Sequence, residues 1–155
     1  MIEKTVVLIK PDGLQRGLVG EIMHRFERKG LKLAGIKMIR LSDEIIDSWY
    51  EHHKDKAFFK DLKDFMELTP VVAMVWLGVE AISTVRKIVG ITKSREAEAG
   101  SIRGDFGMSG SQNIIHASDS IESAEKELGL IFNADEIFDY SSGMDSLIYS
   151  KDDLT

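Results

Sequence analysis

The chain has 155 residues, of which 43% are hydrophobic and 30% charged, so we expect a single domain over residues 1–155 with a substantial core. Its 26 acidic and 20 basic residues give a net charge of −6. This argues against a broad nucleic-acid-binding face but leaves room for a small anion in a cationic cleft. The absence of cysteine excludes disulfides and cysteine-based zinc sites, and it favours the cytoplasm. No apolar run approaches the ~20 residues of a membrane-spanning helix and no signal-peptide pattern is present, so we expect no membrane partner.

The first thirty residues predict a strand and a helix. The apolar run Thr5–Ile9, followed by Lys10-Pro11-Asp12-Gly13, favours a buried strand that ends in a turn. Between Val19 and Phe26 the apolar residues are three and four positions apart, which is typical of one helix face. Gly30 is the expected stop of this helix, because glycine readily adopts the left-handed conformation found there.

The next segment predicts a strand and two helices. Residues 31–41 alternate as a strand does, which places Ala34, Ile36 and Met38 on one face. Ser42 offers a capping side chain at the start of a helix that continues to Tyr50. A short helical stretch is expected around residues 58–66.

The chain then predicts its clearest buried strand at Pro70–Trp76, followed by a helix over Glu80–Val89 that ends at Gly90. Residues 91–113 are rich in glycine, serine and charge and show no clean period. A loop of that length inside a compact domain is usually functional or disordered. This segment is therefore a candidate binding loop.

The last elements are a short extended piece at Ile114–Ile115 and a helix over Asp119–Leu128. Asp119 and Glu122 are placed for a capping box, and Gly129 is the expected stop. The order of strands and helices predicts an α/β sandwich with helices on one face of a sheet, and periodicity leaves the strand order open.

His116 is the candidate for chemistry among the four histidines. It precedes Ser118-Asp119-Ser120 at a predicted helix start, where free backbone N–H groups favour an anion, and neutral imidazole is a competent nucleophile. Glu127 lies two turns along that helix and could return to fix the tautomer of the ring. A buried histidine satisfied by the helix cap remains an alternative. We interpret His24, His52 and His53 as solvated surface residues.

Three cations at segment ends and in the long loop suggest where phosphates could bind. They are Lys10, Arg86 and Arg103, and each alone is more often a surface charge. The chain has no glycine-rich phosphate loop of the common kinds, so any phosphate would be held by side chains. Together the three cations could surround one triphosphate.

Five blocks in collinear order resemble nucleoside diphosphate kinases, over about residues 4–149. They are IKPDGLQRGLVGEI (9–22), PVVAMVW (70–76), SIRGDF (101–106), NIIHASDS (113–120) and SAEKELGLIF (123–132). The resemblance implies a ferredoxin-like βαββαβ antiparallel sheet with helices packed on it and a long loop before the active-site strand. It also implies ping-pong transfer of a γ-phosphoryl group from nucleoside triphosphates to diphosphates through a phosphohistidine, which maintains nucleotide pools.

The same resemblance implies a role for each matching residue. His116 would be the nucleophile, oriented by Glu127 and Ser118. The residues that would contact the nucleotide are Lys10 and Tyr50 near the transferred phosphoryl and the ribose 3′-hydroxyl, Asn113 at the sugar, Arg86, Thr92 and Arg103 at the phosphates, and Phe58 under the base. Mg²⁺ would be bound mainly through the phosphates without protein ligands, and a homo-oligomer, hexameric or tetrameric, is implied. From the residues alone, Phe58 beside Phe59 suits the core better than a base platform, Tyr50 next to Trp49 suits packing equally well, and Ser118 suits a helix entry.

The chain departs from the family pattern in the long loop. Gly110 stands where relatives carry an aliphatic residue that walls the base slot, so nucleotide binding should be weaker by ~1 kcal/mol. Thr92-Lys93-Ser94 replaces a Thr-Asn-Pro, and loss of the proline should make the loop more mobile. Two other functions stay open: a non-catalytic regulatory member of the fold, and a protein-histidine phosphotransfer domain that would not need the base and ribose contacts.

Overall fold

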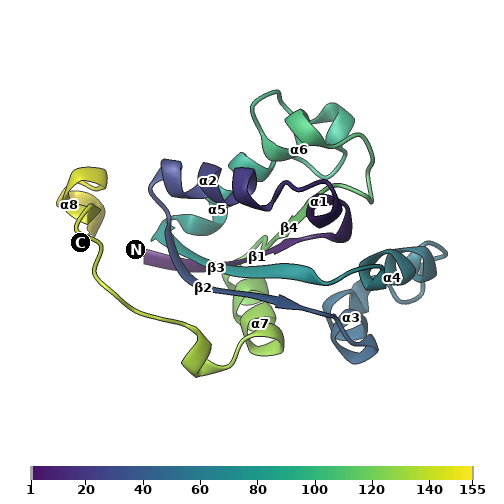
Figure 1. The fold of residues 1–155 in the computed structure, drawn as a ribbon. Coiled ribbons are helices and arrows are strands. Elements are labelled where there is room, and N and C mark those ends of the chain that lie inside the picture. Colours follow the sequence, from purple (N-terminus) through teal and green to yellow (C-terminus); the bar gives the residue numbers. More distant parts are fainter. Residues whose placement is uncertain (1, 155) are drawn as a thin grey trace.

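A four-stranded antiparallel sheet forms the centre of the computed structural model, which describes residues 2–154 (Figure 1). The strand order is β2-β3-β1-β4. Their bounds are β1 (Ile2–Ile9), β2 (Lys32–Ile39), β3 (Val71–Val79) and β4 (Ile115–Ala117). The expected α+β architecture with an antiparallel sheet and packed helices is confirmed.

Helices cover both faces of this sheet, so the expectation of helices on one face is wrong (Figure 1). Val6 and Val7 of β1 point to opposite faces and are both fully buried, which requires apolar cover on each side. The bounds of the helices are α1 (Pro11–Gln15), α2 (Val19–Lys29), α3 (Asp43–Trp49), α4 (Phe59–Glu67), α5 (Ala81–Val89), α6 (Ile102–Phe106), α7 (Ile121–Ile131) and α8 (Asp145–Ile148). Residues of α2, α5 and α6 pack on one face, and residues of α3, α4 and α7 on the other.

Several predicted helix ends are confirmed. Gly30 follows α2 with a left-handed φ of 98°, and the Ser42 hydroxyl caps α3 by accepting from the N–H of Ile45. Gly90 follows α5. These ends depend on local backbone geometry and hydrogen bonds, which a short stretch of sequence specifies.

Other local predictions are wrong. The turn expected after β1 is the short helix α1, with Pro11 in its first turn. Helix α7 begins after Ser120, whose hydroxyl accepts from the N–H of Ser123, rather than at an Asp119 capping box. It continues through Gly129 to Ile131, which is buried against the sheet. The long loop also contains α6, capped by Ser101.

The alternation predicted for residues 31–41 is broken by a bulge in β2. Leu33 pairs with Trp76 and Gly35 with Val75, so Ala34 has no partner of its own. The extra residue moves Ile36 to the face opposite Ala34. The prediction that Ala34, Ile36 and Met38 share one face is therefore wrong. A side chain at Gly35 would meet the backbone of Glu136 at 2.9 Å, which explains a glycine beside the bulge.

The C-terminal segment with α8 returns to the side of the molecule where β1 begins (Figure 1). The Tyr149 hydroxyl donates to the carbonyl of Gly30 and accepts from the N–H of Val79, both at 3.4 Å. Within residues 2–154, no helix has the length and apolar composition to cross a membrane.

Candidate active site

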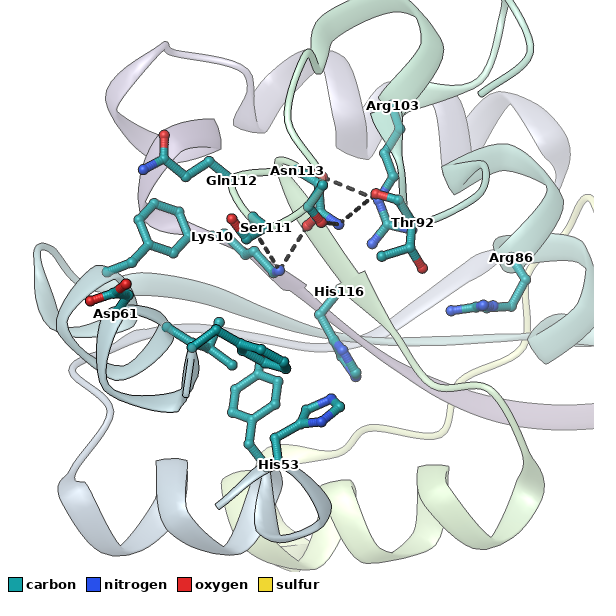
Figure 2. A pocket seen from close by; sticks show the side chains of 15 residues that line it. Lys10, His53, Asp61, Arg86, Thr92, Arg103, Ser111, Gln112, Asn113 and His116 are labelled. Atoms are coloured by element: carbon teal, nitrogen blue, oxygen red, sulfur yellow. Dashed lines mark hydrogen bonds between the residues drawn. The ribbon is translucent and has the colours of Figure 1, made fainter. Parts of the chain in front are cut away.

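A cavity of about 690 Å³ lies beside the C-terminal end of β1 (Figure 2). Its buried or partly buried part, the inner end, is formed by Lys10, Arg86, Arg103, Asn113 and His116. Its more exposed part, the outer end, is formed by Phe58, Asp61, Leu62, Gly110 and Gln112. The two ends thus bring together the start of α4, the long loop and the central strands.

His116 occupies the middle of β4, opposite Leu8 of β1. Its Nε2 lies 2.8 Å from Oε1 of Glu127, so the predicted approach of this carboxylate is confirmed. With a carboxylate as acceptor, the neutral form of the ring carries its proton on Nε2 and has the lone pair on Nδ1. The ring is therefore held in the tautomer suited to nucleophilic attack from Nδ1.

Glu127 is itself held from behind by Ser118. The Ser118 hydroxyl donates to Oε2 of Glu127 at 2.6 Å and accepts from the N–H of Val6 at 3.1 Å. Ser118 is fully buried, and Glu127 is 8% exposed. Both carboxylate oxygens thus have partners, which fixes the side chain that orients His116.

The backbone between Asn113 and His116 is strained. Ile114 has a φ of 73°, which a β-branched residue rarely adopts. Its N–H donates to Oδ2 of Asp12 at 2.9 Å, and its carbonyl accepts from the N–H of Lys10 at 2.9 Å. A side chain at Gly13 would meet that carbonyl at 2.9 Å. Asp12 and Gly13 therefore support the site. The sequence did not predict this role, although both residues belong to the motif Lys10-Pro11-Asp12-Gly13 that follows β1.

Lys10 is a buried cation that lines the inner end of the cavity. Its Nζ donates to Oδ1 of Asn113 at 2.7 Å and to the carbonyl of Ser111 at 3.4 Å. Burial, with a further contribution from the charge of Arg103, lowers the pKa of Lys10 to about 8, and Asp12 offsets part of this effect. The inner end therefore favours a compensating anion.

Arg103 is also buried, and its guanidinium holds the loop together. It donates to the carbonyls of Gly90 (2.9 Å), Asn113 (3.2 Å) and Ile115 (2.6 Å). Burial and the charge of nearby Arg86 lower its pKa to about 10. Three of the five N–H bonds of the guanidinium suffice for these contacts, which leaves two for a ligand.

Asn113, Thr92 and Arg86 are the remaining predicted nucleotide-binding residues at this part of the cavity. Its Nδ2 donates to the carbonyls of Thr92 and Gly110, each at 3.0 Å. Arg86 lines the same cavity, and its Nη1 donates to the carbonyl of Ala117 at 3.4 Å. The structure therefore brings together the predicted residues of three distant segments.

Tyr50 and His53 form one wall of the cavity. The Tyr50 hydroxyl is buried without a hydrogen-bond partner among residues 2–154; burial and the charge of Glu127 raise its pKa, which keeps it neutral. His53 is stacked on Tyr50 at 6.3 Å and packs edgewise on Phe58 at 5.3 Å between ring centroids. The interpretation of His53 as a solvated residue is therefore wrong. Its spacing of three from Tyr50 was the signal, because such residues share one helix side.

The exposure of Phe58 distinguishes it from a core residue. Phe58 is 48% exposed at the outer end, whereas Phe59 packs against the core. A Cβ added to Gly110 would find open space, with Cγ of Lys93 at 4.0 Å as its nearest neighbour. Asp61, Leu62 and Gln112 also line this end, which sequence reasoning did not predict.

In the part of the chain that the structure describes, no three acidic or histidine side chains gather as a metal site.

Comparison with known proteins identifies the family. The sequence model of nucleoside diphosphate kinases matches residues 3–137. The chain belongs to the nucleoside diphosphate kinase family. A nucleoside diphosphate kinase of Parabacteroides distasonis is 51% identical over 153 residues, which cover 99% of this chain and all of the relative. One from Staphylothermus marinus is 54% identical over 138 residues, or 89% of this chain and 98% of the relative.

A solved structure supports the same assignment. The nucleoside diphosphate kinase of Halobacterium salinarum, in complex with CDP, superposes with a TM-score of 0.94 at 41% identity. The superposition covers 97% of this chain and 100% of that one. The fold and the enzyme class, a phosphotransferase acting on nucleoside diphosphates, are therefore established by sequence and structure together.

Proposed function

We propose that this enzyme transfers the γ-phosphoryl group of a nucleoside triphosphate to a nucleoside diphosphate by a ping-pong mechanism, with Nδ1 of His116 as the carrier. Such an activity would maintain the pools of nucleoside triphosphates. The observation that carries the proposal is the contact of 2.8 Å between Glu127 and His116, which lines the inner end together with three cations. A covalent carrier divides one difficult transfer between two anions into two steps at one site.

In the first half-reaction, the lone pair of Nδ1 attacks the γ-phosphorus. The N–P bond forms as the bond from phosphorus to the β–γ bridging oxygen breaks, and the nucleoside diphosphate leaves with that electron pair. Glu127 stabilises the positive charge that develops on the imidazole through its bond to Nε2, and Ser118 keeps Glu127 in place. In the second half-reaction, a β-phosphate oxygen of another diphosphate attacks the phosphorus, and the electron pair of the N–P bond returns to Nδ1.

The cations position the phosphates for in-line transfer. Arg86 and the two free N–H groups of Arg103 would contact phosphate oxygens, with the Thr92 hydroxyl beside them. Lys10 and the neutral Tyr50 hydroxyl would contact the transferred group and the ribose 3′-hydroxyl, and Asn113 the sugar. The polar atom of Tyr50 that lacks a partner supports this role.

Phe58 would provide a stacking surface for the base. Its half-exposed ring at the outer end supports this role, and stacking accepts any base because every base has a π-face. Edge contacts to the base would instead discriminate among nucleotides. We therefore propose a broad base range.

Mg²⁺ would enter with the nucleotide and neutralise charge on its phosphates. The donor set of the cavity fits this arrangement, because the inner end carries cations and the Glu127 carboxylate is occupied by His116 and Ser118. Mg²⁺ commonly keeps several waters and binds through substrate phosphates. The cavity residues would thus bind the phosphates rather than the ion.

A homo-oligomer, hexameric or tetrameric, is part of the proposal. Two apolar side chains on the edge strand β2 support it, since Ile36 is 47% and Met38 60% exposed. Light scattering of the purified protein measures its mass, and a monomer across micromolar concentrations would contradict this part.

The central test uses a nucleoside triphosphate labelled at the γ-phosphate. We expect an acid-labile phosphoprotein that transfers its label to a nucleoside diphosphate, and we expect none in a His116→Ala variant. A regulatory member of the fold would give no phosphoprotein, and a protein-histidine phosphotransfer domain would not pass the label to diphosphates. Label that survives in His116→Ala would contradict the role of this histidine.

A further inference from the structure

Trp49 makes a direct contact with His116 for which the proposed mechanism has no role. The centroids of the two rings are 5.1 Å apart and their planes meet at 78°, an edge-to-face arrangement. Trp49 is the last residue of α3, is 7% exposed, and belongs to the core cluster that also contains residues of the sheet and of α7. Its Nε1 has no hydrogen-bond partner among the described residues, so packing alone holds the indole.

The hydrogen bond to Glu127 does not fix the imidazole by itself. It restrains Nε2 at one point, and the ring can still pivot about that contact. A second cavity of about 250 Å³ lies next to His116 and is lined by Trp49, Glu127 and Lys126, among others. An imidazole that turned toward this second cavity would direct Nδ1 away from the nucleotide.

We propose that Trp49 is a positioning residue that prevents this rotation. Its ring is a rigid wall of the second cavity and, together with Glu127, restrains the imidazole in two directions. Nδ1 then stays directed into the main cavity, both before and after phosphorylation. The inference rests on the proposed phosphohistidine mechanism.

Single-turnover phosphorylation tests the proposal. Trp49→Leu removes the aromatic wall and enlarges the second cavity, so the rate of phosphohistidine formation should fall about 10-fold, because small misplacements of reacting groups carry costs of this order. The affinity for the nucleoside triphosphate should be unchanged, since Trp49 does not line the main cavity. Trp49→Phe keeps a flat ring and should recover most of the rate. A wild-type rate in Trp49→Leu, or no recovery in Trp49→Phe, would overturn the inference.

Ile46→Ala provides a control for simple destabilisation. Ile46 lies in the same helix and the same core cluster as Trp49 and is fully buried. Its truncation should lower stability without changing the phosphorylation rate of the folded protein. An equal fall in rate for Ile46→Ala and Trp49→Leu would reduce Trp49 to a core residue and overturn its positioning role.

Fluorescence reports whether the Trp49 ring stays in contact with His116 when the histidine is phosphorylated. The chain has two tryptophans, and Trp76 packs against Phe26 in the other core cluster. In a Trp76→Phe variant, emission from Trp49 should change when nucleoside triphosphate is added without an acceptor, and it should return when a diphosphate is added. With His116→Ala in addition, the change should disappear. Phosphohistidine formation with constant emission would overturn the inference. A wild-type protein that forms no phosphohistidine would instead overturn the proposed function and the inference together.

Discussion

The inner and outer ends of the cavity are built in different ways. At the inner end and directly behind it, buried polar groups are joined by hydrogen bonds between distant segments, as between Lys10 and Asn113 or between Val6 and Ser118. At the outer end, Phe58 and Gly110 are exposed and belong to one helix start and one loop. Substitutions at the inner end should therefore change chemistry and stability, and those at the outer end should change affinity.

The largest expected effect is at the support of His116. Glu127→Ala removes the hydrogen bond to Nε2 and the charge that stabilises the developing imidazolium, so phosphorylation should slow by about 10²-fold. Glu127→Gln keeps a side chain of the same shape without the charge and should give a smaller loss. Rapid-quench measurements of phosphohistidine formation check both. Equal rates of phosphohistidine formation in wild type and Glu127→Ala would contradict the expectation that the inner end controls the chemistry.

Lys10 makes the stability of the inner end depend on pH. Its folded pKa is about 8, below the ordinary value of 10.5. Between these values the unfolded chain holds a proton that the folded chain has released, so Lys10 makes the free energy of unfolding rise with pH, by about 1.4 kcal/mol per unit. Below pH 8 the cost of burying the charge is fully present.

Urea denaturation at pH 8 and pH 9.5 measures this contribution. Relative to a Lys10→Met variant, the wild type should gain about 1.6 kcal/mol over this interval, because Lys10 is already half deprotonated in the folded protein at pH 8. Parallel pH profiles for the two proteins would show that Lys10 is not the titrating group.

At the outer end, removal of Phe58 should weaken binding without slowing the chemistry. Phe58→Ala removes the proposed stacking surface, so the binding free energy should weaken by about 1.5 kcal/mol, or about tenfold in Kd. The loss should be similar for purine and pyrimidine diphosphates. Calorimetric titration measures these affinities, and single-turnover rates at saturating nucleotide should stay near wild type. A fall in the saturated rate as large as that of Glu127→Ala would contradict the proposed difference between the ends.

The smallest expected effect is a gain. Gly110→Val places an apolar side chain in open space beside the proposed base site, and nucleotide should bind more tightly by about 1 kcal/mol, or about fivefold. Gly143→Val is a matched control, because a Cβ there meets nothing within 4 Å and the position does not line the cavity. Unchanged affinity in Gly110→Val would show that the missing wall does not matter.

The parts of the fold that sequence predicts well are those with local causes. The apolar spacing of α2 and the left-handed glycine at its end need no distant partner, and both are confirmed. The bulge in β2 depends on the pairing of Leu33 and Gly35 with β3, and helix α7 passes Gly129 because Ile131 is buried against the sheet. Such features follow from tertiary packing, which local patterns do not contain.

The site divides in the same way. The approach of Glu127 to His116 was predictable, because both lie around one short strand-to-helix connection. The support that Asp12 gives to the backbone of Ile114 was not, because 102 residues separate them in the chain. His53 was misplaced because adjacent histidines on a polar segment suggest solvent, while its ring packs between Tyr50 and Phe58. The proposed mobility of the loop after Thr92 stays a prediction.

The pairing of β4 with β1 also has a consequence for when the folding chain becomes active. Val7 pairs with Ala117 and Leu8 with His116, so the histidine is seated by a contact that closes more than one hundred residues of chain. The entropy of closing so long a segment is lost before the pairing stabilises the chain, so such long-range pairings slow folding and we expect this one to form late. We therefore expect a nascent or partly folded chain to be inert until nearly its whole length has been assembled, so that catalytic competence appears in one late step.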